Sequence, residues 1–111
     1  MDTGAYLARI GLAEPPKTLA ELQVAHLLAV PFENLDILAG VPISMEPDAI
    51  WDKVVRRRRG GFCYELNGLF ARLLEALGYT VTVLSAQVMH RDGRESNEYE
   101  HLTLRVDLDE P

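Results

Sequence analysis

Cysteine is scarce in this sequence, and that scarcity limits how the chain can be stabilised. Among 111 residues only Cys63 carries a thiol, so an internal disulfide is excluded. Basic residues are also in the minority, with 11 lysines and arginines against 17 aspartates and glutamates and a formal net charge of −6. An acidic chain is poorly suited to general binding of nucleic acid or anionic membrane, so neither is expected as a partner.

Long apolar runs and metal-ligand motifs are missing as well. No apolar run approaches the length that spans a bilayer, and no signal-peptide pattern opens the sequence. The three histidines, His26, His90 and His101, do not fall at metal-ligand spacing with Cys63, so no metal site is expected. We therefore expect a cytoplasmic protein whose thiol is kept reduced.

The N-terminal part of the chain predicts helices. A short helix is expected over residues 4–10, and a second over about 19–29. Thr18 and Glu21 form a capping-box pattern at the start of the second helix. Pro31 disfavours helical backbone at the residue before it, so the second helix is expected to end there.

The middle of the chain holds the clearest element. Residues 31–44 are predicted to be extended chain and turns. A helix is expected from near Pro47 into the arginine run 56–59, interpreted as a solvated helix end. A longer helix follows from Cys63 until Gly78. Its buried stripe recurs every three or four residues, at Leu66, Leu69, Phe70, Leu73, Leu74 and Leu77.

The pattern then changes to that of strands. Residues 79–88 are rich in β-branched side chains, and residues 101–108 alternate between apolar and polar. A polar loop is expected between them. The predicted class is α+β, with a helical domain over 1–78 and the first strands of an incomplete β domain over 79–111. Two strands alone form a sheet of marginal stability, so we interpret the architecture as truncated.

Cys63 is the strongest candidate for chemistry. It follows Gly60 and Gly61 and stands at the start of the predicted long helix. Unpaired backbone N–H groups and the helix dipole favour a thiolate over a thiol at such a place. The two glycines allow close approach of backbone or substrate. A thiolate attacks thioesters and other carbonyls, so the position predicts a nucleophile for acyl transfer.

The competing interpretation is structural. Most free cysteines are small buried hydrophobic residues, and position alone favours that role for Cys63. The context shifts the balance, because His101 heads a later strand. A cysteine at a helix start served by a histidine on a strand is the arrangement of papain-like sites.

Three segments carry a resemblance to a known family. They are Arg59-Gly60-Gly61-Phe62-Cys63-Tyr64-Glu65 with Asn67, Pro31-Phe32-Glu33-Asn34-Leu35, and the weaker Tyr6-Leu7-Ala8-Arg9-Ile10. Together with the interval from Cys63 to His101, they closely resemble the arylamine N-acetyltransferases over essentially the whole chain. The resemblance implies a papain-like fold in which a helical bundle precedes an antiparallel β-barrel.

The resemblance also implies a reaction. Members of this family move acetyl from acetyl-coenzyme A to an arylamine or hydrazine nitrogen by a ping-pong route through an acetyl-cysteine. By position, Cys63 is then the nucleophile and His101 its base. The family's third catalytic residue, an aspartate, is expected on the following strand, beyond Pro111. This chain is therefore expected to be the N-terminal part of the enzyme and to have weak or no activity alone.

The same motifs suggest supporting residues. Phe32 and Phe62 are expected to line the acceptor pocket or, equally, to fill the core. Glu33 and Arg59 are expected to form a buried ion pair that ties their two loops together. The residues expected to support the cysteine loop and the helix start are Gly60, Gly61, Tyr64 and Asn67.

Two other functions stay open at the level of sequence. Papain-like and transglutaminase-like hydrolases place a cysteine and a histidine similarly, although their local signatures differ. A catalytically inactive fragment that serves as an interaction module is the other alternative. An apolar edge exposed by truncation would favour its self-association.

Overall fold

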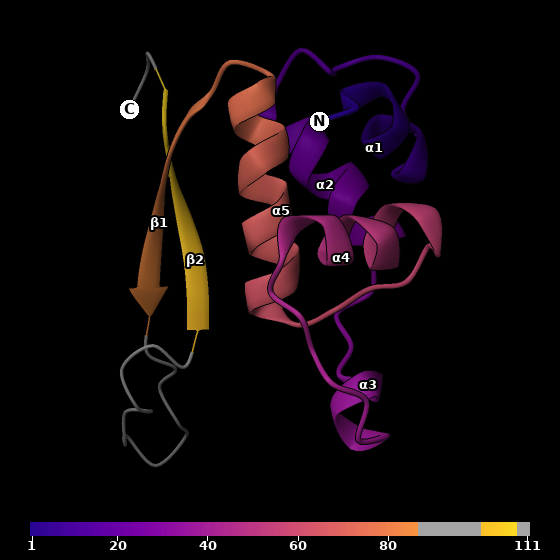
Figure 1. The fold of residues 1–111 in the computed structure, drawn as a ribbon. Coiled ribbons are helices and arrows are strands. Elements are labelled where there is room, and N and C mark those ends of the chain that lie inside the picture. The colour runs from indigo at the N-terminus through magenta and orange to yellow at the C-terminus, as the bar shows by residue number, and fades with distance from the viewer. Residues whose placement is uncertain (87–100, 109–111) are drawn as a thin grey trace.

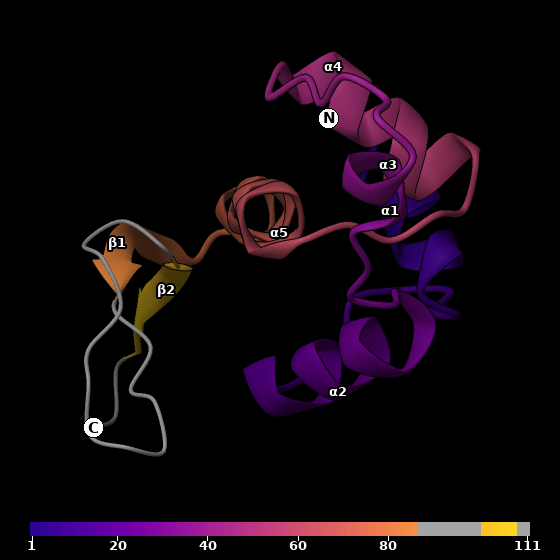
Figure 2. The same ribbon diagram turned by 90° about the horizontal axis from the view of Figure 1, so that it is seen from below.

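The computed structural model describes residues 1–86 and 101–108, and α5 (Cys63–Ala76) lies at its centre (Figure 1). The strands pack on one side of α5 and the other helices on the opposite side (Figure 2). The remaining elements, in chain order, are α1 (Thr3–Arg9), α2 (Leu19–Ala29), α3 (Leu35–Leu38), α4 (Pro47–Trp51), the π-helix η1 (Asp52–Arg56), β1 (Thr80–Ala86) and β2 (His101–Asp107). The α+β order predicted from sequence is confirmed.

The helix boundaries largely follow the sequence signals. The hydroxyl of Thr18 accepts the backbone N–H of Glu21 at 3.2 Å, so the predicted cap starts α2. The Asp2 carboxylate does the same for α1, accepting the N–H of Ala5 at 3.0 Å. Gly78 follows α5 with a φ of 99°, the left-handed backbone that ends helices without cost only for glycine.

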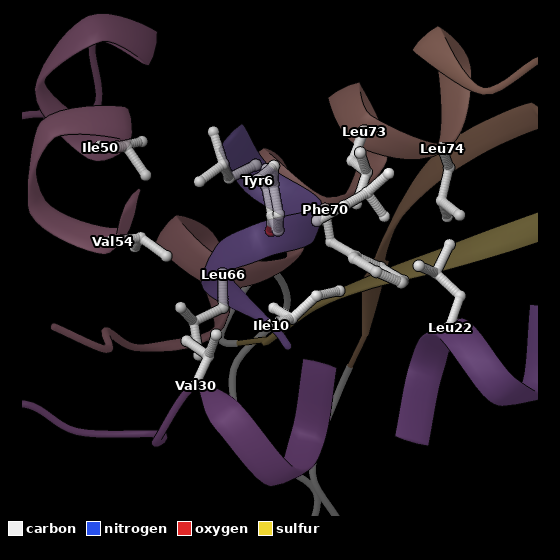
Figure 3. Packing of buried hydrophobic residues seen from close by; sticks show 12 residues of the cluster. Tyr6, Ile10, Leu22, Val30, Ile50, Val54, Leu66, Phe70, Leu73 and Leu74 are labelled. Carbon is white, nitrogen blue, oxygen red and sulfur yellow. The ribbon is translucent and has the colours of Figure 1, made fainter. Parts of the chain in front are cut away.

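The core forms where α5 meets the N-terminal helices (Figure 3). Tyr6 of α1 and Val54 of η1 are fully buried there, as is the predicted stripe of α5 at Leu73 and Leu74. Burial of large apolar side chains stabilises a fold by about 1.5–3 kcal/mol each. This side of α5 therefore supplies the rigid platform for the first residues of the helix.

The segment 31–44 was predicted to lack helix, and that prediction is wrong at α3. The Glu33 carboxylate accepts the N–H of Leu35 at 3.2 Å, which satisfies a backbone donor at the start of the short helix. Asp36 is held by the guanidinium of Arg59 at 2.7 Å. Contacts from distant residues thus stabilise a helix too short to be recognised from local sequence.

The arginine run also differs from its interpretation as a solvated helix end. The helix begun at Pro47 widens into a π turn, closed by the hydrogen bond from Arg57 N–H to the Asp52 carbonyl at 2.8 Å. Arg58 then takes a φ of 54°, and Arg59 turns inward to carboxylates. Arg56, Arg57 and Arg58 are exposed as interpreted, so the difference lies at Arg59.

The two described strands form an antiparallel sheet. Thr80 pairs with Asp107, and Ala86 pairs with His101 at the other end. Three side chains of this sheet, Val81, Leu104 and Val106, pack against the core beside α5. The strand pattern predicted over 101–108 is confirmed over His101–Asp107, while the predicted residues 87 and 88 of the first strand lie outside the described residues.

The outer side of α2 is apolar and uncovered. Leu22 packs in the core, whereas Leu27 and Leu28 are 68% and 85% exposed. All three leucines indicated a helix in the sequence, but α2 is apolar on both sides, so periodicity did not tell which side faces inward. In the described part of the chain, no helix is both long and apolar enough to cross a membrane.

Candidate active site

The loop that precedes Cys63, residues 59–62, is called the cysteine loop here. Backbone hydrogen bonds join it to the segment after α2. Gly61 N–H donates to the Pro31 carbonyl at 3.3 Å, and Glu33 N–H donates to the Gly61 carbonyl at 2.9 Å. Phe32 and Gly61 thereby form a parallel bridge. A β-carbon on Gly60 would stand 1.7 Å from the Pro31 carbonyl oxygen, so only glycine fits there. The loop is fixed in place immediately before Cys63.

Cys63 is the first residue of α5 and is 7% exposed. Phe62, the residue before it, has no side-chain acceptor with which to cap the helix. Glu65 makes the return half of a capping box instead, because its Oε1 accepts the Phe62 N–H at 3.2 Å. The first turn of α5 is thus anchored by a buried carboxylate.

His101 begins β2 at the same end of the molecule at which α5 begins (Figure 1). The connection between the two elements is direct. Asn67 lies one helical turn after Cys63, on the same face of α5, and its Nδ2 donates to the Leu102 carbonyl at 2.6 Å. The neighbour of His101 is therefore tied to the turn that follows Cys63.

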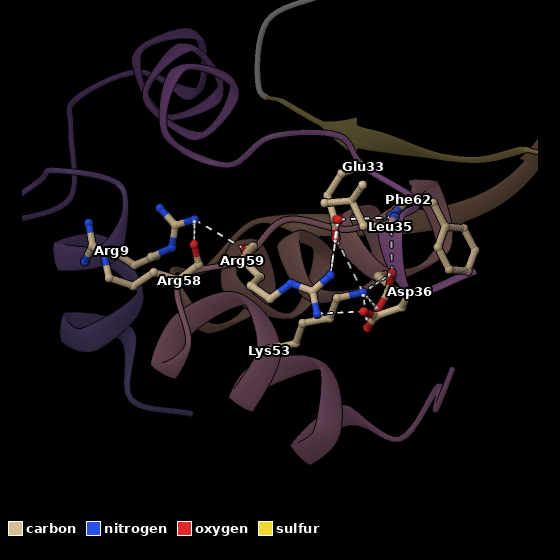
Figure 4. A network of polar contacts seen from close by, with 9 residues as sticks. Arg9, Glu33, Leu35, Asp36, Lys53, Arg58, Arg59 and Phe62 are labelled. Atoms are coloured by element: carbon tan, nitrogen blue, oxygen red, sulfur yellow. Dashed lines mark hydrogen bonds and ion pairs between the residues drawn. The ribbon is translucent and has the colours of Figure 1, made fainter. Parts of the chain in front are cut away.

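Five charged side chains meet beneath the cysteine loop, and Figure 4 shows four of them labelled. We call this set the ion-pair network: Glu33, Asp36, Lys53, Arg59 and Glu65. Arg59 binds Asp36 at 2.7 Å and Glu33 at 3.2 Å, so the expected contact between Glu33 and Arg59 is present. The hydrogen bond from Arg59 lowers the pKa of Asp36, and Asp36 in turn raises the pKa of Arg59.

Lys53 is the most buried cation of the network. Its Nζ lies 3.0 Å from Glu65, 3.4 Å from Asp36 and 3.6 Å from Glu33, with the lysine side chain only 6% exposed. A buried ammonium is tolerated when carboxylates surround it in this way. Lys53 links the carboxylates of the loop after α2 to the carboxylate that caps α5.

Arg9 lies nearby, and its guanidinium donates hydrogen bonds to backbone carbonyls. Its guanidinium donates to the carbonyls of Val54 at 2.7 Å and Ala29 at 2.9 Å. It donates more weakly to those of Arg58 and Arg59 (Figure 4). One side chain therefore joins the end of α2 and the middle of η1 to the loop that leads to Cys63. Burial, followed by the charge of Arg58, lowers the pKa of Arg9.

The two phenylalanines proposed for an acceptor pocket lie in different environments. Phe32 is 68% exposed, so it is not core filler, while Phe62 is half-buried with its ring centroid 6.1 Å from that of Tyr64. A groove of about 420 Å³ is lined by Tyr64, next to Cys63, and by Leu102, next to His101. Most of its other lining is apolar, including Ile50, Leu69 and Val83.

Sequence reasoning missed Asp36, Lys53 and Glu65. Glu65 had a readable signal, because a glutamate three residues after the cap position is half of a capping box. Lys53 had none, since the carboxylates that surround it lie in other segments of the chain. Across residues 1–86 and 101–108, no group of three or more histidine, cysteine or acidic residues is arranged to hold a metal ion.

Residues 17–111 match the N-acetyltransferase family. This chain belongs to the arylamine N-acetyltransferase family. A Mycolicibacterium smegmatis arylamine N-acetyltransferase is 48% identical over 94 residues, which cover 80% of this chain and 34% of that protein.

Solved structures of arylamine N-acetyltransferases agree with the fold. That of the Nocardia farcinica protein superposes with a TM-score of 0.87 at 43% identity, covering 100% of this chain and 40% of that one. The Mycobacterium marinum protein, solved in complex with CoA, gives a TM-score of 0.85 at 40% identity, with coverages of 98% and 42%. The chain thus spans less than half the length of the family members it matches.

Proposed function

We propose that this chain is the N-terminal part of an acetyl-coenzyme A-dependent arylamine N-acetyltransferase. The observation that carries the proposal is the hydrogen bond from Asn67 to Leu102, because it ties the turn that follows Cys63 to the strand start that carries His101. Family membership supplies the reaction class, and the complex of one relative with CoA supports acetyl-coenzyme A as the donor.

The reaction proceeds in two steps, acetylation of Cys63 and transfer of the acetyl group to the acceptor. His101 removes the Cys63 proton, and the sulfur attacks the carbonyl carbon of acetyl-coenzyme A. The bond between that carbon and the coenzyme sulfur breaks, and coenzyme A leaves with the proton. An arylamine or hydrazine nitrogen then attacks the acetyl-cysteine and passes a proton through His101 to the departing Cys63 sulfur.

The supporting residues divide into positioning and contact roles. Gly60, Gly61, Glu33 and Arg59 hold the cysteine loop against residues 31–33. Asn67 sets the distance between helix and strand, and Tyr64, the residue after Cys63, lines the apolar groove. Exposed Phe32 and half-buried Phe62 offer aromatic surface beside the loop, which suits an aromatic acceptor.

The proposal extends to the architecture. Residues 1–78 are the helical domain that carries the nucleophile, and residues 79–111 are the first strands of an antiparallel β-barrel in a papain-like arrangement. The aspartate that would orient His101 belongs to the next strand of the family pattern. Without such a carboxylate the imidazole is poorly oriented, so the chain alone is expected to transfer acetyl weakly or not at all.

The first half-reaction gives the cleanest test. The purified chain is incubated with acetyl-coenzyme A in the cytoplasmic pH range and its intact mass is measured. We expect one added acetyl group on Cys63, slow in formation, absent in Cys63→Ala and strongly reduced in His101→Ala. The urea-unfolded wild-type chain is the matched control, because it keeps the thiol and loses the site.

Two results would contradict the proposal. Equal acetylation of the folded and unfolded chains would show that no site activates Cys63. Cleavage of peptide or amide substrates at Cys63, without an acetyl adduct from acetyl-coenzyme A, would indicate a cysteine hydrolase instead. Light scattering on the same sample reports whether the chain self-associates.

A further inference from the structure

We infer that Lys53 and Glu65 act as a pair of positioning residues that set the reactivity of Cys63. The inference rests on the proposed function, in which Cys63 is the nucleophile. Neither residue belongs to the ion pair that the motifs predicted, which joins Glu33 and Arg59. Both are buried charges that lie behind the cysteine loop rather than in the groove of Tyr64 and Leu102.

The first step of the argument is the contact between Glu65 and the loop. Glu65 Oε1 accepts the Phe62 N–H at 3.2 Å, and its side chain is 3% exposed. A β-carbon on Gly61 would lie 2.7 Å from the same oxygen, so the carboxylate is packed directly on the loop. Glu65 thereby fixes both residues that precede Cys63.

The second step is what fixes Glu65. The Nζ of Lys53 donates to both carboxylate oxygens, at 3.1 and 3.0 Å, which sets the rotation of the carboxylate as well as its position. Without this cation, the buried carboxylate would be left unpaired and could turn away from the Phe62 N–H. Lys53 therefore both orients and neutralises the cap of α5.

The third step is the backbone that delivers Lys53. Lys53 and Val54 are adjacent in sequence and are both buried, at 5% and 0% exposure. They lie in η1, and π turns of this kind widen a helix locally and occur frequently at functional sites. From this turn Lys53 reaches Glu65, while Val54 lies in the apolar core.

The test uses alkylation of Cys63 by iodoacetamide, which needs no acetyl donor and no missing residue. We expect Lys53→Met and Glu65→Ala to slow alkylation of the folded chain by about tenfold or more, because either change releases the loop that places Cys63 at the start of α5, where backbone N–H groups favour the thiolate. Lys53→Arg is expected to restore the rate, because arginine also binds a carboxylate through two donors. Arg57→Met is the matched control: it removes an exposed cation paired with Asp52 at 3.0 Å and leaves the rate unchanged.

The direction of the change in alkylation rate distinguishes a positioning role from a purely stabilising role. If the pair only holds the fold together, the variants loosen the chain and expose Cys63, so alkylation speeds up. A faster or unchanged rate in folded Lys53→Met overturns the inference. Should that variant not fold, Glu65→Gln keeps the side-chain volume and an acceptor for Phe62. We then expect a smaller slowing, and an unchanged or faster rate in Glu65→Gln also overturns the inference.

The same samples test the positioning role and the proposed function separately. If wild type takes acetyl from acetyl-coenzyme A but the variants are alkylated like wild type, the positioning role fails and the proposed function stands. If the variants slow alkylation but wild type takes no acetyl, the positioning role stands and the proposed function fails.

Discussion

On one side of α5, α1, α2 and η1 share a fully buried apolar core with it, whereas on the other side β1 and β2 lie half-buried against it (Figure 2). On the helical side, the cysteine loop, the ion-pair network and Arg9 connect Cys63 to the core. The strand side connects His101 to α5 through the backbone next to it, at Leu102. In residues 1–86 and 101–108, the nucleophile is therefore positioned through buried charged contacts and the base through the half-buried hairpin.

This difference assigns separate tasks to the two sides. A nucleophile must meet its reaction partner within fractions of an ångström, and buried packing with paired charges provides that rigidity. A half-buried hairpin keeps more of its backbone near solvent and opens more readily. We expect changes on the helical side to affect the whole fold, and changes on the strand side to affect mainly the approach of His101.

The largest effect is expected at Gly60. In Gly60→Ala the new methyl group would lie 1.7 Å from the Pro31 carbonyl oxygen, which is backbone and cannot move aside. The pairing of the loop with residues 31–33 is lost, and we expect destabilisation by about 3 kcal/mol, at the upper end for overpacking. Urea unfolding followed by circular dichroism measures the change.

Gly68 provides the control within the same region. A β-carbon there meets nothing within 4 Å, and the residue lies inside α5. Gly68→Ala is expected to stabilise the chain by about 0.5–1 kcal/mol, the ordinary gain of alanine over glycine in a helix. Equal effects of the two substitutions would show that Gly60 is not a close-approach site.

A second effect on the helical side depends on pH. Burial, aided by the charge of Arg9, lowers the pKa of His26 from 6.5 to about 4, and its Nε2 lies 2.8 Å from the Tyr6 hydroxyl. As pH falls below about 6.5, the unfolded chain takes up a proton that the folded chain refuses. The free energy of unfolding is therefore expected to decrease by about 3 kcal/mol as pH falls to about 4, and this group adds no further change below that.

The measurement compares wild type with His26→Gln at a series of pH values. Because both chains carry the same carboxylates, the difference between their unfolding free energies isolates the histidine. The difference should narrow as pH falls from about 7 to about 4. Curves that stay parallel across this range would place His26 in contact with solvent.

The two sides also differ in how far sequence predicted them. The stripe of α5 and the alternation of β2 follow from periodicity, because each depends on neighbours along its own element. Glu33 and Arg59 were paired through their motifs, and the contact is present. Such features are local or carried by a recognisable motif.

What sequence did not predict depends on contacts between distant segments of the chain. The burial of Lys53 in η1 depends on carboxylates from other segments of the chain, those of Glu33, Asp36 and Glu65. Likewise α3 depends on the carboxylates of Glu33 and Asp36 meeting distant partners.

The smallest expected effect is on the strand side. Asn67→Ala removes the donor to the Leu102 carbonyl, for which we expect a loss of about 1 kcal/mol, the usual net value of one hydrogen bond. The control is Thr82→Ala, which removes an exposed acceptor 3.3 Å from Arg105 and should cost less than about 0.5 kcal/mol. In Asn67→Ala we also expect faster hydrogen exchange in β2 with α5 unchanged. If α5 exchanges faster to the same extent, helix and hairpin open as one unit, and the division between the two sides of α5 is lost.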